Sequence, residues 1–464
     1  MLDADGGGHE DAEESSGVED ADEDRNDENA DEEEAPVAEE PGGSVGGGSA
    51  PPTPQGAEQQ GSLKTNGVTL SADEFESHVD DFAAFSFLTD NGISRSGAEA
   101  FLKQRMHSSL KRRSRFLLNQ FIHESVHLEE KVVDCCRNGC LAYTGERSQQ
   151  TVCEFCKADR FYANRKVAKT TRYFSIAAWM TMMLANPDIG PDMMGLMRKA
   201  RLAAASGSTS RDDWYNSDIF RILLAMGKFS SDTDFALSIS ADGFEAWRQG
   251  GFQGWPIIGT ILSMPISSRF KTASQLLLTV TPGPREPKDL DSFLYPIMEE
   301  LNILANGISG LKVHGSDAAH VLRVFLLQVT TDMPAGDKLI NANGSNGMSP
   351  SRFSPLFGWW SAQHRHYYFP DLHPVTGEVL FTLQDAAAEL RTIETITAAV
   401  EEIEEARRQK RTKAHVEDLC RKAGFKGYSL LLCPSQRHRA MYPNMEYFWG
   451  LEHSHQCRAN GLKR

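Results

Sequence analysis

Four cysteines constrain the fold of this 464-residue chain more than any other feature. Cys136 and Cys140 form one short pair, and Cys153 and Cys156 form a second pair after twelve intervening residues. Two tight turns at this separation can bring four thiolates together around a tetrahedral Zn²⁺. A closed set of four thiolates leaves no position for water, so we predict a structural zinc ion and not a catalytic one.

Two alternative interpretations of these cysteines remain open, namely unpaired core residues and redox chemistry. Cys135 stands next to the first pair and is predicted to be a spare thiol. Eight cysteines in the whole chain are too few for a disulfide scaffold, and metal-ligand spacing is typical of a reducing compartment.

The charge of the chain is concentrated at its beginning. Of the 64 acidic residues, 19 lie in the first 40 positions beside a single Arg, so the remainder carries 45 acidic against 47 basic residues. We predict that residues 1–71 are a disordered tail, first acidic and then rich in Gly, Ser and Pro. A purely solvating tail and a partner-binding segment are both consistent with this composition. We find no signal peptide and no membrane span, so we expect an intracellular protein without a membrane partner.

Changes of pattern divide the rest of the chain. We expect an α+β protein whose segments are a helical basic segment (72–130), a zinc-binding module (131–165), a helical region (166–230), a sheet core (231–340), an irregular region (341–383), and a long helix at 384–423 within a C-terminal segment (384–464).

The basic segment carries a cluster of cations centred on Lys111, Arg112, Arg113 and Arg115. A solvated helix face would explain the cluster. The alternative is a patch that contacts phosphates or directs nuclear import.

The sheet core is predicted from apolar runs that are bounded by Gly or Pro. We expect strands at 235–241, 255–263, 275–281 and 321–331, and a helix that Asp289 caps before the last of them. In the first strand we expect one apolar face and one small, polar face. The last run would also suit a buried helix.

Asp242 and Asp332 each follow one of these apolar runs. If the first and fourth strands are neighbours, the two carboxylates lie side by side at one edge of the sheet. Two close carboxylates repel each other unless a cation lies between them, and Mg²⁺ prefers such oxygen ligands. Ordinary turn or cap residues are the alternative, because Asp-Gly is a common turn pair.

Four segments in this order, "DCCRNGCLAYTGERSQQTVCEFC", "SISADGF", "LLLTVTPGPREPKDLDSFLYPIMEEL" and "VTTDMPAGDKL", resemble the CACTA-type (En/Spm-like) cut-and-paste DNA transposases. The resemblance covers about 131–375 and continues more weakly to the end. It implies a ribonuclease-H-like core with an Asp-Asp-Glu triad that binds Mg²⁺ or Mn²⁺, with DNA as the partner, a nuclear location and no small-molecule substrate; self-association is left open. It places the first acid at Asp242 and the second at Asp332.

The chain departs from the family pattern after the second acid. Family members show Gly-His-x-Gly and then Pro-Cys-Arg-x-Cys, which looks like a second zinc element. Here Ser345 stands in place of the His, and Ser351 and Ser354 stand in place of the two Cys. Serine hydroxyls are poor zinc ligands, so we expect that this second metal site is lost. The remaining histidines nearby are His364, His366 and His373.

A second departure lies near the C-terminus. The segment "AMYPNMEYFWGLEHSHQC" keeps a Pro and a Glu of the family pattern but lacks its Asp and His. Glu452 is therefore the candidate for the third acid, with an ordinary surface Glu as the alternative. We expect a truncated or degenerate transposase with impaired catalysis. A non-catalytic DNA- or protein-binding derivative, or the product of a decayed element, is the competing hypothesis.

Overall fold

The computed structural model describes residues 72–103, 110–125, 130–207, 212–245, 253–344, 347–351, 354–363, 365–368, 376 and 391–432. The chain divides into two units, residues 1–58 and 59–464, and everything described below belongs to the second unit. The tail predicted at 1–71 and the candidate third acid Glu452 lie outside the described residues. Within the described part of the chain, no helix is long and apolar enough to span a bilayer.

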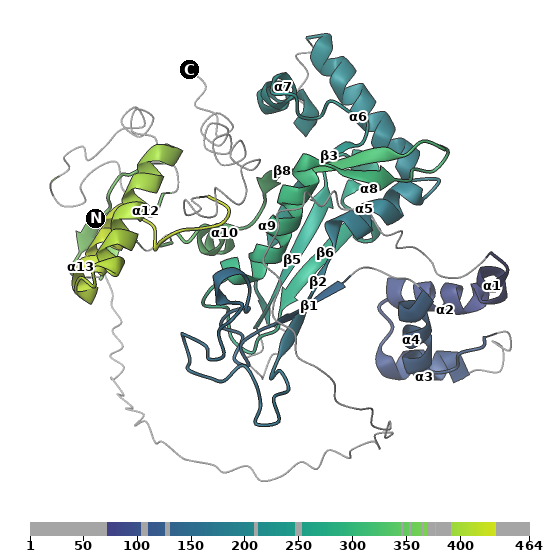
Figure 1. Cartoon of the computed structure of the whole chain (residues 1–464), viewed down its shortest axis with the longest axis horizontal. Helices are drawn as coiled ribbons and strands as arrows, with labels where there is room; N and C mark the ends of the chain where they lie inside the picture. Colours follow the sequence, from purple (N-terminus) through teal and green to yellow (C-terminus); the bar gives the residue numbers. More distant parts are fainter. Residues whose placement is uncertain are drawn as a thin grey trace, which may run out of the picture. The chain divides into compact units, whose positions relative to one another are not determined.

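Four short helices form a small bundle of their own (Figure 1). Their bounds are α1 (Ala72–Ser77), α2 (Val79–Asp90), α3 (Arg95–Lys103) and α4 (Arg115–Ser125). Aliphatic side chains from α2, α3 and α4 form its core, including Leu88, Leu102 and Leu118. Because helices of this length are marginal on their own in water, this shared core is what holds them.

A mixed sheet organises the central part of the chain (Figure 1). Its main path runs in the order β1-β2-β6-β5-β3-β8-β7, and β4 pairs with β5. The strands are β1 (Glu130–Asp134), β2 (Thr170–Phe174), β3 (Asp234–Ala241), β4 (Phe244–Glu245), β5 (Gln253–Ile261), β6 (Gln275–Thr281), β7 (Ile308–Leu311) and β8 (His320–Val329). β3 is antiparallel to β5 and parallel to β8, and β5 is antiparallel to β6.

The four strands predicted from apolar runs are present as β3, β5, β6 and β8. The small, polar face expected for β3 is buried, because Ala236 and Ser238 are only 0% and 4% exposed. This strand is buried on both faces, so its alternation of large and small residues reflects packing and not contact with water. β2 lies in a region for which the sequence predicted only helices.

Helices pack against this sheet and contribute many large apolar side chains to its core. The contributing helices are α5 (Ile176–Ala185), α6 (Gly190–Ala205), α7 (Asp218–Ala225) and α9 (Asp291–Asn306), and the short α8 (Ile266–Arg269) follows β5. α9 contacts β6, β8 and α5. The buried apolar side chains of α9 include Phe293, Leu294, Ile297, Met298 and Leu301.

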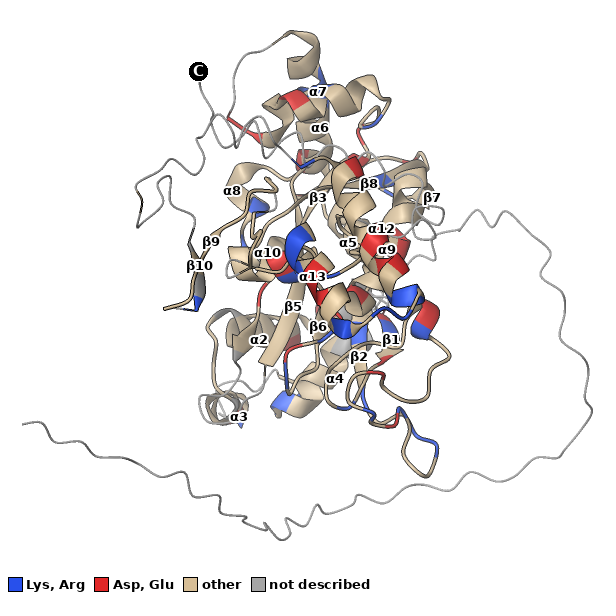
Figure 2. Ribbon diagram, turned by 90° about the vertical axis from the view of Figure 1, so that its left-hand side faces the viewer, with Lys and Arg blue, Asp and Glu red and all other residues tan. Residues whose placement is uncertain are grey.

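The C-terminal described part contains α10 (Met333–Leu339), β9 (Trp359–Ser361), β10 (His366–Tyr368), α12 (Ile393–Arg408) and α13 (Lys413–Ala423). The single helix predicted over 384–423 is wrong, because the chain turns between α12 and α13. Lys410 adopts a left-handed conformation there, and the Thr412 side chain accepts the His415 amide to begin α13. Acid-to-base pairs one turn apart are present on α12, for example between Glu405 and Arg408. Figure 2 shows the acidic and basic residues of the ribbon in red and blue.

Candidate functional site: an acidic pocket and a four-cysteine module

The register of β3 and β8 brings the two predicted acids to one edge of the sheet. Ile239 pairs with Val329 in the parallel ladder, three residues before Asp242 and Asp332 respectively. Since paired residues of parallel strands advance together, both carboxylates follow the sheet at the same edge. They line one pocket of about 230 Å³, which we call the acidic pocket. The neighbouring arrangement considered from the sequence is therefore present.

Each aspartate also contributes to its own turn. Asp332 caps α10, because its Oδ1 accepts the Ala335 amide at 2.8 Å. Asp242 Oδ1 accepts the Gly243 amide at 2.7 Å. The turn and cap interpretation is thus correct for one oxygen of each residue. It does not exclude a cation, because an ionised carboxylate has a second oxygen and several lone pairs.

A third carboxylate, Glu286, lines the same pocket and was missed by the sequence analysis. It pairs with Lys338 at 2.6 Å, and the Lys338 ammonium lies 4.8 Å from the centre of the Trp255 ring. Strand direction explains its position. β6 and β3 are both antiparallel to β5, so the loop after β6 leaves the sheet at the edge where β3 and β8 end.

The acidic pocket suits a divalent cation by the chemistry of its donors, which are carboxylate oxygens. Its three carboxylates do not converge at ligand spacing. Among the residues that the structure describes, the four cysteines are the group that brings three or more metal-binding atoms together.

The predicted zinc ligands do converge. The sulfur atoms of Cys136, Cys140, Cys153 and Cys156 all lie within 4.8 Å of one another, and those of Cys136 and Cys156 are 3.4 Å apart. Zn–S bonds of about 2.3 Å in a tetrahedron require S–S separations of about 3.8 Å. The four thiols therefore fit a Zn²⁺ ion, and we call residues 136–156 the four-cysteine module.

Local hydrogen bonds favour the thiolate at one of the four cysteines, Cys156, whereas burial raises the pKa of Cys136 and of Cys140. The Asn138 amide lies 3.4 Å from Cys136 Sγ, and the Asn138 side chain donates to Cys156 Sγ at the same distance. Burial opposes ionisation of Cys156, but hydrogen bonds from the Ala158 amide and Asn138 outweigh it and lower its pKa to about 6. Burial raises the pKa of Cys135 to about 12, which keeps that side chain a neutral thiol.

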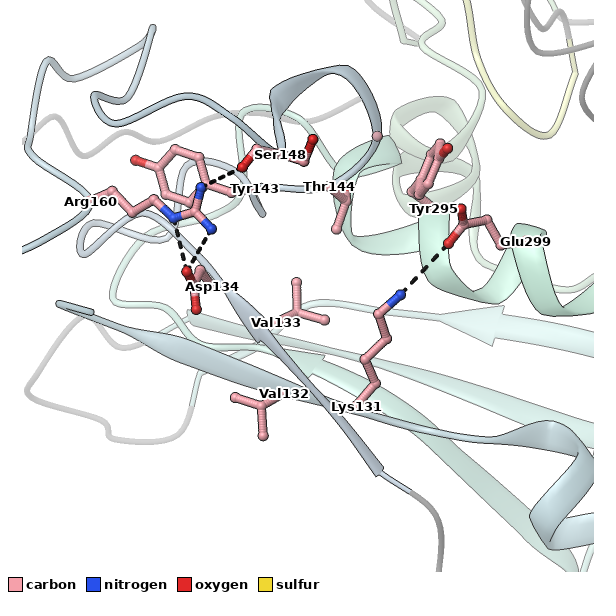
Figure 3. A pocket seen from close by; sticks show the side chains of 11 residues that line it. Lys131, Val132, Val133, Asp134, Tyr143, Thr144, Ser148, Arg160, Tyr295 and Glu299 are labelled. Carbon is pink, nitrogen blue, oxygen red and sulfur yellow. Dashed lines mark hydrogen bonds and ion pairs between the residues drawn. The ribbon is translucent and has the colours of Figure 1, made fainter. Parts of the chain in front are cut away.

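A second pocket, of about 430 Å³, lies between β1, the four-cysteine module and α9 (Figure 3). Two ion pairs line it, Lys131–Glu299 at 3.8 Å and Arg160–Asp134 at 2.6 Å. Because both cations face a carboxylate inside the pocket, its charges balance. We assign no ligand to it.

Two of the four predicted phosphate contacts have structural roles in the helical bundle. Arg112 pairs with Asp81 at 2.8 Å and lies 3.4 Å from the centre of the Phe121 ring. Arg115 donates to the Ile93 carbonyl at 2.9 Å. The other two members of the predicted cluster, Lys111 and Arg113, are both exposed.

The two serines that the resemblance places opposite family cysteines, Ser351 and Ser354, both contact a buried arginine. The Ser354 amide donates to Ser351 Oγ at 3.1 Å. Arg391 Nε donates to the carbonyls of both serines, and its Nη2 donates to Ser349 Oγ. His366 begins β10, and the other two nearby histidines and Ser345 lie outside the described residues.

Residues 213–351 match the model of the transposase family tnp2, which covers less than half of the chain. The matched segment contains β3, β5, β6, α9 and β8, together with both aspartates of the acidic pocket. No curated protein matches the chain. The family match supports a transposase-like protein.

Proposed function

We propose that this chain is a transposase-like protein of the CACTA type that binds DNA in the nucleus and cleaves it weakly or not at all. One observation carries the proposal. Asp242 and Asp332 end adjacent parallel strands and line one pocket, within the segment that matches a transposase family. A DNA strand and a divalent cation are the ligands that such a pair of carboxylates would serve.

The order of elements supports a ribonuclease-H-like core. β3, β5 and β6 form a meander, α9 crosses the sheet, and β8 returns beside β3. This return is what places the second acid next to the first. The four-cysteine module, as a structural zinc site, is a separate part of the proposal, because its closed donor set has no open coordination position.

In this proposal Asp242 and Asp332 hold Mg²⁺ or Mn²⁺, which would activate an attacking oxygen for phosphodiester cleavage. The residues themselves supply the negative charge and the orientation, since each carboxylate is fixed by a backbone amide. Impaired catalysis follows from the donor set. Glu286 is paired with Lys338, so this third carboxylate must leave its ion pair before it can help to position the reacting groups.

The test uses the purified full chain, Mn²⁺ and DNA duplexes with and without transposon ends. We expect salt-sensitive DNA binding, Mn²⁺ binding that Asp242→Ala and Asp332→Ala abolish, and slow nicking or none. Asp317→Ala, which removes an exposed carboxylate from the loop before β8, is the matched control. Absence of DNA binding, or Mn²⁺ binding that survives both pocket substitutions, would contradict the proposal.

A further inference from the structure

Residues 282–289, in the loop between β6 and α9, contact both the acidic pocket and the four-cysteine module. We call this segment the connecting loop. It carries Glu286 into the acidic pocket, and its remaining backbone lies against the four-cysteine module. The four-cysteine module holds the connecting loop, and the loop places a carboxylate in the acidic pocket. A change in the fold of the module can therefore change the position of that carboxylate.

The four-cysteine module holds the connecting loop through backbone contacts. The Cys140 carbonyl accepts the amides of Lys288 and Asp289, at 2.8 and 3.0 Å. Gly139 lies so close to the loop that a Cβ atom would stand 2.2 Å from the Gly283 carbonyl oxygen, and its φ of +74° also favours glycine. The loop therefore follows the turn that carries the first two cysteines.

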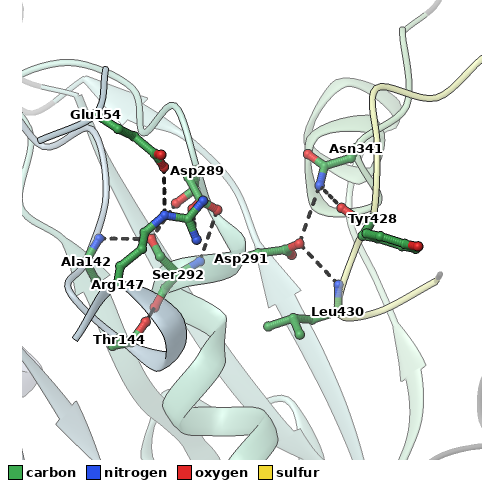
Figure 4. A network of polar contacts seen from close by, with 10 residues as sticks. All are labelled: Ala142, Thr144, Arg147, Glu154, Asp289, Asp291, Ser292, Asn341, Tyr428 and Leu430. Carbon is green, nitrogen blue, oxygen red and sulfur yellow. Dashed lines mark hydrogen bonds and ion pairs between the residues drawn. The ribbon is translucent and has the colours of Figure 1, made fainter. Parts of the chain in front are cut away.

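Side chains reinforce this hold on both halves of the module (Figure 4). Arg147 joins Glu154, which lies between the last two cysteines, to Asp289, with contacts of 2.7 and 3.0 Å. Lys169 Nζ donates to the carbonyls of Arg137 and Gly283, at 3.1 and 2.9 Å. Both cysteine turns are thus tied to the loop.

The other side of the connecting loop is tied to the acidic pocket. The Pro284 carbonyl accepts the Gln253 amide at 2.9 Å, and Gln253 itself lines the pocket. Glu286 contacts Lys338, which projects from α10, the helix that Asp332 caps. The position of Glu286 therefore depends on contacts at both sites.

We propose that Glu286 is a third carboxylate of the cation site, positioned by the four-cysteine module through the connecting loop, and that Lys338 is its counter-ion until a divalent cation binds. The inference rests on the proposed function. Three carboxylates in one pocket repel one another, and Lys338 relieves this repulsion. A divalent cation at Asp242 and Asp332 would attract Glu286 more strongly than a single ammonium group does. Lys338 therefore competes with the divalent cation for Glu286. A correctly folded four-cysteine module favours binding of the cation, because it holds Glu286 in the pocket.

The test is Mn²⁺ affinity of the zinc-loaded full chain, measured by the electron paramagnetic resonance signal of free Mn²⁺. We expect Glu286→Gln to weaken Mn²⁺ binding about tenfold, because one anionic ligand is lost. We expect Lys338→Gln to tighten it about threefold, because the competing cation is removed. Lys131→Gln and Glu299→Gln are matched controls, since they break another Lys–Glu pair away from the acidic pocket.

Coupling to the four-cysteine module is tested with Lys169→Gln, which loosens the connecting loop and leaves every cysteine in place. It should weaken Mn²⁺ binding severalfold while zinc content stays unchanged. Combined with Glu286→Gln it should add little, because both substitutions act through the same carboxylate. Additive losses in the double variant would show that the loop does not act through Glu286.

Two failures are distinguishable. If Glu286→Gln binds Mn²⁺ like its matched controls while Asp242→Ala abolishes binding, the inference is wrong and the proposed function stands. If the unsubstituted chain binds no Mn²⁺, or binds it equally well after Asp242→Ala, the proposed function fails and the inference falls with it.

Discussion

The four-cysteine module and the serine turn, by which we mean residues 349–351 and 354–356, share one type of local contact around different atoms. In the module, the Asn138 amide points at the sulfur of Cys136, two residues before it. In the serine turn, the Leu356 amide points at the hydroxyl of Ser354, also two residues before it. One turn is suited to a metal ion and the other is not, because a hydroxyl remains neutral where a thiolate forms.

A different cation occupies the centre of the serine turn. Arg391 is only 7% exposed, and its guanidinium donates to carbonyls of Ser351, Ser354 and Ala423. Burial lowers its pKa to about 10, which still leaves it charged at neutral pH. The comparison teaches that a buried guanidinium can hold the carbonyls and hydroxyls of a segment that has no thiolates.

The largest effect is expected from removing the metal of the four-cysteine module. Cys153→Ser with Cys156→Ser should release about one zinc per chain and lower the free energy of unfolding by more than about 3 kcal/mol, because metal binding stabilises such small modules. Metal analysis and thermal unfolding measure this. A metal-free variant as stable as the original chain would show that the four thiols are ordinary core residues.

The corresponding change in the serine turn is Arg391→Met. It should lower the free energy of unfolding by about 3 kcal/mol, because several buried oxygens lose their donor. Zinc content should not change. Arg408→Met is the control, since Arg408 is 70% exposed and forms only a surface pair. Equal stability of the two variants would mean that Arg391 does not organise the turn.

Asp291 tests how the C-terminal region is attached to the core (Figure 4). It accepts hydrogen bonds from Asn341 and the Leu430 amide, and burial raises its pKa well above the ordinary value. Because the pKa of Asp291 is higher in the folded chain than in the unfolded chain, its protonated form favours the folded state. The contribution of Asp291 to the free energy of unfolding is therefore complete below about pH 4 and is lost as the pH rises. Asp291→Asn should therefore stabilise the protein at pH 7 by about 1 kcal/mol or more, and the gain should shrink toward pH 4. A gain that is equal at both values of pH would contradict the assignment.

The smallest effect is expected from introducing cysteines at the two serine positions. Ser351→Cys with Ser354→Cys should change stability by less than about 1 kcal/mol and should not add a second zinc ion, because Arg391 remains buried at the turn. Zinc stoichiometry is the measurement. A second tightly bound zinc in this double variant would show that Arg391 yields its place to a metal and that the two turns are equivalent.

Local patterns were sufficient to predict the parts of the site that follow apolar strands. Asp242 and Asp332 could be identified because β3 and β8 are apolar runs that are each followed by an aspartate. The convergence of the cysteines could be predicted because their spacing is itself the signal. The short strands β1 and β2 could not, because their sequences "EKVVD" and "TTRYF" lack a continuous apolar run.

Other parts depend on contacts between distant segments. Glu286 could not be placed without knowing that β6 and β3 are both antiparallel to β5, which no local pattern encodes. Arg391 could not be identified as buried, because the carbonyls that it binds come from residues about 30 to 40 positions away on either side. In both cases the sheet order or the tertiary contact determines the role of the residue.

The most direct test of the central claim is anomalous diffraction from crystals of the full chain soaked in Mn²⁺. The account predicts a manganese peak in the acidic pocket between Asp242 and Asp332, with Glu286 turned away from Lys338 toward the ion. A pocket with no manganese peak, with the Glu286–Lys338 pair intact, would contradict it.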